Sequence, residues 1–194
     1  MLIVVNDPTL VERELRAGRL CCPHCDGELR PWGHARHRVL RTTAGEIGLR
    51  PRRARCGRCS ATSVLLSDLC LSRRVDEVAV IGRALLEKAA GAGHRRIALL
   101  LGRPQETVRG WLRRFSSRTA LIQAHFCHWA LALDPRLETV TPQVSPLAEA
   151  LEAMGLAARA ASLVFGPRAV WSWVSAMTGG ALLSNTNSPL PAPR

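Results

Sequence analysis

The sequence predicts an α+β fold in which strands occupy the first third of the chain and helices occupy the rest. Short runs of β-forming residues, broken by glycines, lie between two Cys-x-x-Cys pairs. After residue 72, apolar residues recur every three or four positions, which is the helical period. These two patterns divide the chain into an N-terminal strand and helix segment, a β module, two helical regions and a disordered tail: residues 1–18, 19–71, 72–118, 119–183 and 184–194.

The charge of the chain is concentrated in its first part. Of the 194 residues, 27 are basic and 15 are acidic, which gives a net charge of +12. Residues 1–118 hold 23 basic and 11 acidic side chains, whereas residues 119–194 hold four of each. This asymmetry indicates a polyanionic partner, with nucleic acid the first choice. The alternative is a solvated basic surface in an arginine-rich proteome.

Residues 9–18, "TLVERELRAG", predict a short helix beside the β module. Thr9 and Glu12 have the spacing of a capping box at its start, and Gly18 ends it.

The cysteine pairs predict a metal site. Cys22 and Cys25 form "CPHC", and Cys56 and Cys59 form "CGRC", with 30 residues between the pairs. Two such turns supply four soft thiolate ligands in tetrahedral geometry, as one structural zinc ion requires, and a closed four-thiolate site leaves no position for catalytic water. Gly27 and Gly57 are expected to permit tight backbone around the sulfurs. Strands over residues 28–32, 37–41, 49–56 and 63–66 complete the prediction of a small β zinc ribbon.

The other cysteines and histidines are weaker candidates. Cys21 has the wrong spacing to Cys25 for a metal-binding turn. The histidines of the module, His24, His34 and His37, could ligate a metal, but four cysteines leave no vacancy. Cys70 and Cys127 lie in apolar surroundings and are expected to be small core residues.

The region after the ribbon has the spacing of a helix-turn-helix. Val78, Ile81, Leu85 and Ala89 predict a first helix. Counting from His94, Ala98 is fifth, Gly102 ninth, Val108 fifteenth and Trp111 eighteenth, which matches the pattern in which the small residue lets two helices cross and glycine makes the turn. Pro104 suits the first position of the second helix. Arg103 departs from the pattern, since an apolar residue is usual there.

The outward face of the second helix is expected to read DNA bases in the major groove. Its base-reading candidates are Gln105, Glu106, Arg109 and Arg113. Four arginines around it are expected to contact phosphates: Arg95, Arg96, Arg114 and Arg118. The alternative is an ordinary helical hairpin, and the basic charge of this half favours DNA binding.

The ribbon on "CPHC…CGRC" followed by "GHRRIALLLGRPQETVRGWLRRF" resembles the N-terminal DNA-binding arm of bacterial insertion-sequence transposases. More closely, it is similar to short, uncharacterised zinc-ribbon and helix-turn-helix proteins of high-GC bacteria, in which "RPWGHAR", "RPRRARC" and "GAGHRRIA" recur. The resemblance covers residues 1–118 closely and the remainder loosely. It implies DNA binding, in the setting of mobile elements, and supplies no catalytic residue.

The neutral half predicts a C-terminal helical module. Residues 119–133, 145–166 and 167–183 read as helices, the second capped by Ser145 with Pro146 at its first position. Four carboxylates in some seventy-five helical residues do not suit the metal-dependent nuclease core of a transposase, so catalysis is rejected: Asp134, Glu138, Glu149 and Glu152. The module either forms a homodimer or binds a partner through Trp129, Trp171 and Trp173, or packs against the preceding helices.

The sequence therefore predicts a non-enzymatic protein that binds double-stranded DNA sequence-specifically, as a transcriptional regulator or a mobile-element accessory factor. No targeting signal opens the chain and no membrane span or small-molecule substrate is expected, so the predicted location is cytoplasmic, at the nucleoid. Two alternatives stay open: an adaptor that binds proteins through the ribbon and the C-terminal helices, and a catalytically inactive transposase fragment.

Overall fold

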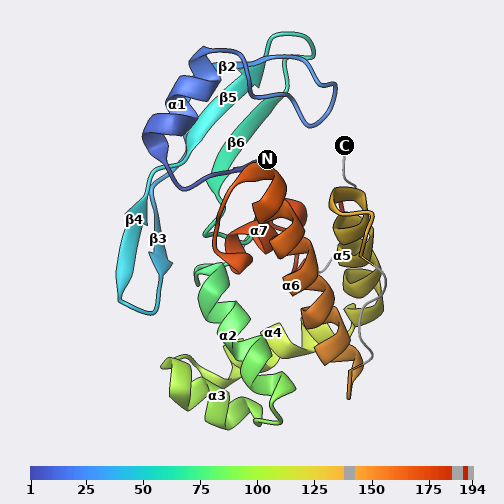
Figure 1. Cartoon of the computed structure of the whole chain (residues 1–194). Coiled ribbons are helices and arrows are strands. Elements are labelled where there is room, and N and C mark those ends of the chain that lie inside the picture. The colour runs from blue at the N-terminus through green and yellow to red at the C-terminus, as the bar shows by residue number, and fades with distance from the viewer. Residues whose placement is uncertain (138–142, 185–189, 192–194) are drawn as a thin grey trace.

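Seven helices and six strands make up the described part of the chain, which covers residues 1–137, 143–184 and 190–191 of a computed structural model (Figure 1). The six strands and the first helix come before the other six helices, so the α+β class is confirmed. We call residues 1–77 the sheet part and residues 78–184 the helical part. The sheet part contains β1 (Leu2–Val4), α1 (Pro8–Arg16), β2 (Leu29–His34), β3 (Arg38–Arg41), β4 (Glu46–Leu49), β5 (Arg52–Cys56) and β6 (Thr62–Ser67).

Four strands form one sheet in the order β1-β6-β5-β2, and β3 and β4 form a separate hairpin. β1 runs parallel to β6, a pairing between residues over sixty positions apart that the sequence analysis did not specify. The hairpin was missed in part, because residues 49–56 were expected to form one strand. Pro51, which has no N–H to donate, separates β4 from β5. Gly48, one of the glycines between the cysteine pairs that were expected to break the strands, lies within β4, where an added Cβ would stand 2.7 Å from the ring of His37.

The N-cap of helix α1 lies two residues before Thr9, the N-cap of the expected capping box. Asp7 is the N-cap and accepts a hydrogen bond from the Leu10 N–H at 3.0 Å. Glu12 pairs instead with Arg52 of β5, Nε to Oε2 2.8 Å. The Thr9–Glu12 capping box is therefore wrong, and Glu12 ties the helix to the sheet. The buried face of α1 packs with residues of the sheet: Val11, Leu15, Leu29, Ala54 and Leu65.

One hydrophobic cluster runs through the whole helical part. Its helices are α2 (Val78–Ala89), α3 (His94–Leu101), α4 (Gln105–Ser116), α5 (Thr119–Leu133), α6 (Pro146–Phe165) and α7 (Val170–Met177). The helices expected in residues 119–183 thus share their core with those expected in residues 72–118. Ser145 caps α6 through a hydrogen bond from the Ala148 N–H at 3.2 Å, as the sequence predicts.

The tryptophans expected at a self-association surface pack within the helical part. Trp173 is 7% exposed, and its indole N–H donates to Ser162 Oγ at 2.9 Å. Trp171 lies against α2 so closely that a Cβ on Gly82 would stand 2.0 Å from its ring. Trp171 therefore packs against a preceding helix, as one of the two interpretations of this half expects, whereas Trp173 bonds to α6.

No helix among the described residues is long and apolar enough to cross a membrane. The tail expected to be disordered, residues 184–194, lies largely outside the described residues, as does Glu138.

Candidate metal centre and nucleic-acid surface

The four cysteines of the two Cys-x-x-Cys pairs come together at one end of the sheet. Cys22 and Cys25 lie in the loop that precedes β2, and Cys56 is the last residue of β5, which pairs with the start of β2. The four sulfurs lie within 4.8 Å of one another, with Cys22 Sγ 3.7 Å from Cys59 Sγ and Cys25 Sγ 3.5 Å from Cys56 Sγ. Sulfurs bound to one tetrahedral zinc ion at about 2.3 Å would be about 3.8 Å apart, so the cluster fits such a metal.

The two turns repeat the same backbone pattern around these sulfurs. The His24 N–H donates to Cys22 Sγ at 3.4 Å, and the Arg58 N–H donates to Cys56 Sγ at 3.3 Å. In each turn the residue after the second cysteine adopts a positive φ, 57° at Asp26 and 61° at Ser60. The N–H of that residue closes the turn on the carbonyl of the first cysteine, at 3.0 and 3.1 Å. Donors aimed at sulfur stabilise thiolates, which are the form that binds metal.

The thiols differ in acidity, because hydrogen bonds from N–H groups, neighbouring thiols and burial balance differently at each sulfur. The N–H groups of Cys59 and Arg58, opposed by burial, lower the pKa of Cys56 to about 6. The Gly27 N–H lowers the pKa of Cys25, but the neighbouring Cys59 thiol and burial outweigh it and raise that pKa to about 12. Adjacent thiolates repel one another, so a bound divalent cation is what would let all four ionise together.

Gly27 is required beside the cluster, whereas Gly57 is not. A Cβ on Gly27 would stand 3.0 Å from Cys56 Sγ and 2.8 Å from Arg58 Cβ. A Cβ on Gly57 would meet the Arg30 side chain at 3.6 Å and the Glu28 carbonyl oxygen at 3.9 Å, which are ordinary contacts. The expected role of tight backbone therefore holds for the first glycine alone.

We expect Gly27→Ala to lower the free energy of unfolding by about 1–3 kcal/mol through overpacking of the cluster, and to weaken metal retention. The matched variant Gly57→Ala should change neither. Thermal melting with metal analysis of both proteins checks this, and equal losses in the two variants would show that the turn is not packed as described.

The other cysteines lie outside the cluster. Cys21 is exposed and pairs through its backbone with Glu28 in an isolated bridge. Cys70 is buried and Cys127 is half-buried. His125 contacts the Met177 carbonyl at 3.1 Å, and burial lowers its pKa, so this ring is a packing residue of α5.

Helices α3 and α4 meet at a left-handed turn. Gly102 ends α3 with φ 59° and ψ 41°, which is the conformation expected of the ninth position. Pro104 is the N-cap of α4 and not its first residue. Three of the buried residues of this pair, Ala98, Val108 and Trp111, hold positions of the pattern. The full buried set is Ile97, Ala98, Val108, Trp111, Leu112 and Phe115.

The four base-reading candidates lie together on the exposed side of α4. Arg109 Nη1 stands 3.6 Å from Glu106 Oε2, and both side chains are largely exposed, so this ion pair holds neither side chain firmly. Gln105 and Arg113 are exposed one turn before and one turn after Arg109. The exposed face of α4 thus offers hydrogen-bond donors and acceptors to a partner, and no buried contact has to be broken before they bind.

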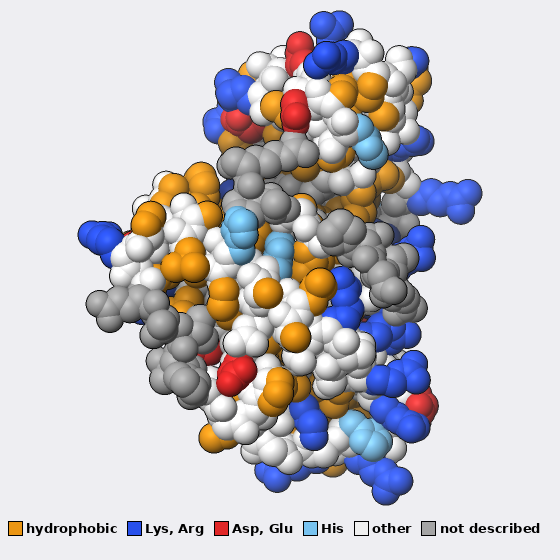
Figure 2. All heavy atoms as spheres, turned by 90° about the vertical axis from the view of Figure 1, so that its right-hand side faces the viewer, with side chains coloured by type: hydrophobic (Ala, Val, Ile, Leu, Met, Phe, Trp, Pro, Cys, Tyr) orange, Lys and Arg blue, Asp and Glu red, His pale blue; other side chains and the backbone are white. Residues whose placement is uncertain are grey.

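The four phosphate candidates fall into two groups. Arg95 and Arg96 are exposed on the first turn of α3. Arg114 donates to the Gly110 carbonyl of its own helix at 3.0 Å. Arg118 donates to the carbonyls of Ala181 and Ser184, both at 3.3 Å, so its guanidinium is turned toward the C-terminal segment. Lys and Arg side chains gather along the right-hand edge of the face in Figure 2, over both parts of the molecule.

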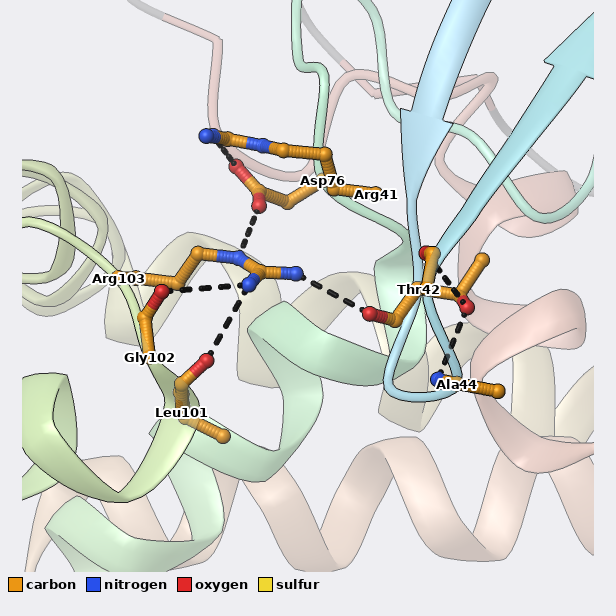
Figure 3. Close-up of polar contacts among 8 residues, drawn as sticks. Arg41, Thr42, Ala44, Asp76, Leu101, Gly102 and Arg103 are labelled. Carbon is orange, nitrogen blue, oxygen red and sulfur yellow. Dashed lines mark hydrogen bonds and ion pairs between the residues drawn. The ribbon is translucent and has the colours of Figure 1, made fainter.

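Arg103, which departs from the helix-turn-helix pattern, joins the two parts of the molecule (Figure 3). Its Nε lies 2.6 Å from Asp76 Oδ1, and its Nη2 donates to the Thr42 carbonyl at the tip of the β3–β4 hairpin, at 3.1 Å. Arg41 binds the other oxygen of Asp76 at 2.8 Å. The sequence analysis noted the departure and missed the partners. A charged residue at a position that should be buried was the available signal, because such a charge needs a counter-ion.

No protein-family model, curated protein or solved structure matches the chain.

Proposed function

We propose that this protein binds double-stranded DNA sequence-specifically, with α3 and α4 acting as a helix-turn-helix and the four cysteines holding one structural zinc ion in a β ribbon. One observation carries the proposal. An exposed face bearing Gln105, Arg109 and Arg113 lies on a helix whose other side is fully packed, after a glycine turn of the left-handed kind. A rigid helix with that face fits the major groove.

Each group of side chains has a separate task in this proposal. Arg109 and Arg113, four residues apart, can each place two donors on a guanine edge, and Gln105 can pair with adenine. Arg95 and Arg96 contact phosphates and set the position of the helix on the duplex. Cys22, Cys25, Cys56 and Cys59 would hold the zinc ion, which supplies folding energy to the sheet part and no reaction step.

Selection of duplexes from a random-sequence pool by the full-length protein tests the proposal. Enrichment of one motif is the expected result. If no motif is enriched and the affinity depends on salt but not on sequence, the protein binds polyanions nonspecifically and the proposal is wrong.

The two groups of phosphate candidates should respond differently to substitution. Arg95→Ala should weaken binding to all sequences alike and reduce the log–log salt slope by about one unit. Arg118→Ala should instead lower the free energy of unfolding by about 1–3 kcal/mol, because it removes charge-assisted hydrogen bonds within the fold. Salt titrations with thermal melting of both variants check this. A changed slope in Arg118→Ala without a loss of stability would return Arg118 to the DNA surface.

An adaptor function is the second candidate, and an exposed apolar surface favours it. Leu163, Val164 and Phe165 end α6, and all three are exposed, Leu163 at 74%. Val170, at the start of α7, is exposed as well. Apolar side chains grouped in this way are typical of protein contacts. In that case the random pool would yield no motif.

The proposed homodimer through the C-terminal helices is tested on the full chain, because removing residues 119–194 would open the core that α5 to α7 share with α2 to α4. If the protein is dimeric in sedimentation at micromolar concentration, the enriched motif should contain two related half-sites about one helical turn, or a multiple of it, apart. A monomer would leave only the packing role for these helices.

A further inference from the structure

We infer that the buried Asp76–Arg103 ion pair positions the sheet part against the recognition face, so that both parts bind one continuous stretch of DNA backbone. The inference rests on the proposed DNA-binding function and adds a second contact surface to it. It also gives Arg103, the one departure from the helix-turn-helix pattern, a positioning role.

Asp76 binds the β3–β4 hairpin through Arg41, in addition to binding Arg103. Arg41, the last residue of β3, binds Asp76 Oδ2 through Nη2 at 2.8 Å. Its backbone N–H donates to the Val75 carbonyl at 2.8 Å, and its carbonyl accepts from the Glu77 N–H at 3.0 Å. These backbone hydrogen bonds therefore join the hairpin to residues 75–77, the segment that leads directly into α2.

The turn before α4 is held from the other side. Arg103 follows Gly102, and its Nη1 donates to the carbonyls of Leu101 and Gly102 at 3.3 Å each. Its Nε and Nη2 reach Asp76 and the Thr42 carbonyl (Figure 3). The Asp76 carboxylate thus binds two guanidinium groups, that of Arg41 from the hairpin and that of Arg103 from the turn before α4.

The burial of this contact gives it a defined geometry. The Asp76 side chain is 3% exposed and the Arg103 side chain is 15% exposed. Buried ion pairs contribute little to stability compared with apolar residues of the same size, and their best-attested use is to fix one arrangement. An apolar residue at position 103 would suffice for packing, whereas directed hydrogen bonds set the orientation of the hairpin relative to α4.

The surface that this orientation presents is basic. Arg36 and Arg50 flank the hairpin, just before β3 and just after β4, and both are exposed. Lys and Arg side chains also line one edge of both parts in Figure 2, a view from the side away from the hairpin. A duplex that is seated on α4 and extends to the hairpin would meet Arg36 and Arg50 on an element whose position is already fixed, and contacts fixed in advance lose less entropy on binding.

The test compares salt dependence in four full-length proteins on the duplex that the wild-type protein enriches. These are the wild type, Arg103→Leu, the neutral pair Asp76→Asn/Arg103→Gln, and the control Arg83→Leu. Arg83 is exposed on α2, and among the described residues its ion pair is with Glu87, one turn along the same helix, so its substitution removes one positive charge without touching the hairpin contact. The neutral pair removes both charges of the Asp76–Arg103 contact, and Arg41, which loses its carboxylate partner, has a side chain that is partly exposed to solvent. Each protein is also made with Arg36→Gln/Arg50→Gln.

We expect Arg36→Gln/Arg50→Gln to reduce the log–log salt slope by about two units in the wild type and in Arg83→Leu. In both variants of the Asp76–Arg103 pair the same double substitution should change the slope by less than one unit. Zinc content and helical circular dichroism should be unchanged in these variants at 25 °C. An equal two-unit change in all four backgrounds would overturn the inference, as would no change in the wild type.

Failure of the inference can be told apart from failure of the proposed function. If the wild type enriches no motif, the function itself is rejected and the inference with it. If the wild type enriches a motif that needs Arg109 and Arg113 but not Arg36 and Arg50, only the inference is rejected. Loss of the fold in both pair variants would assign Asp76 and Arg103 to stability alone.

Discussion

Cys25→Ser or Cys59→Ser is expected to release the metal and unfold the sheet part of the chain. Binding of structural zinc by small modules is worth about 10–16 kcal/mol in apparent free energy, and most of that energy is folding energy. The core of the sheet part is small, and two of its buried members, Cys22 and Cys56, are themselves cluster cysteines. Metal analysis and thermal melting of the purified variants measure both effects.

Cys21→Ser is the matched control, because Cys21 adjoins Cys22 but is exposed and lies outside the cluster. It should keep the full metal content and the wild-type melting temperature. Full zinc content in Cys22→Ser, with loss in Cys21→Ser, would reverse the assignment within this doublet.

Arg109→Ala and Arg113→Ala are expected to cost about 1–3 kcal/mol each in binding to the preferred duplex. Each substitution should also relax the base preference at one or two positions, because a side chain that reads a base edge discriminates only at that edge. Both arginines are exposed, so stability should hardly change. Binding titrations on the enriched duplex and on its single-base variants measure the effect.

Equal weakening on specific and scrambled DNA would show that α4 does not read bases. Specificity would then have to come from the sheet part, where the sequence offers Arg36, Arg38, Arg52 and Arg53. The structure orders these candidates. Arg52 is paired with Glu12, and Arg38 donates to the Arg74 carbonyl at 2.7 Å. Arg36 is exposed and is the first to test.

The cysteine cluster and most helices could be predicted from the sequence because their signals are local. A Cys-x-x-Cys turn places two sulfurs together within four residues, so each half of the cluster is local. Only the contact between the two turns depends on the rest of the fold. Helix α5 covers residues 119–133 as expected, since its apolar content and length leave few alternatives. Gly102 takes the left-handed conformation that its place in the pattern requires.

The contacts that could not be predicted join residues distant in the chain. β1 pairs with β6, Trp171 packs on Gly82, and Arg103 reaches Asp76 and the hairpin tip. No periodicity marks such pairs, because each residue has an unremarkable neighbourhood in the sequence. Arg103, a charged residue where the local pattern has an apolar one, meets its carboxylate partner only when the sheet part folds against the helical part.

The ratio of affinities for the enriched duplex and for a scrambled duplex of equal length and composition tests the central claim most directly. It should be measured at one physiological salt concentration with the full-length protein and with Arg109→Ala/Arg113→Ala. We expect the wild-type protein to prefer the enriched duplex by about a thousandfold or more. The double variant should lose most of that preference. Its affinity for scrambled DNA should fall only by the amount that the loss of two positive charges causes. A wild-type ratio near one would contradict sequence-specific binding by α4.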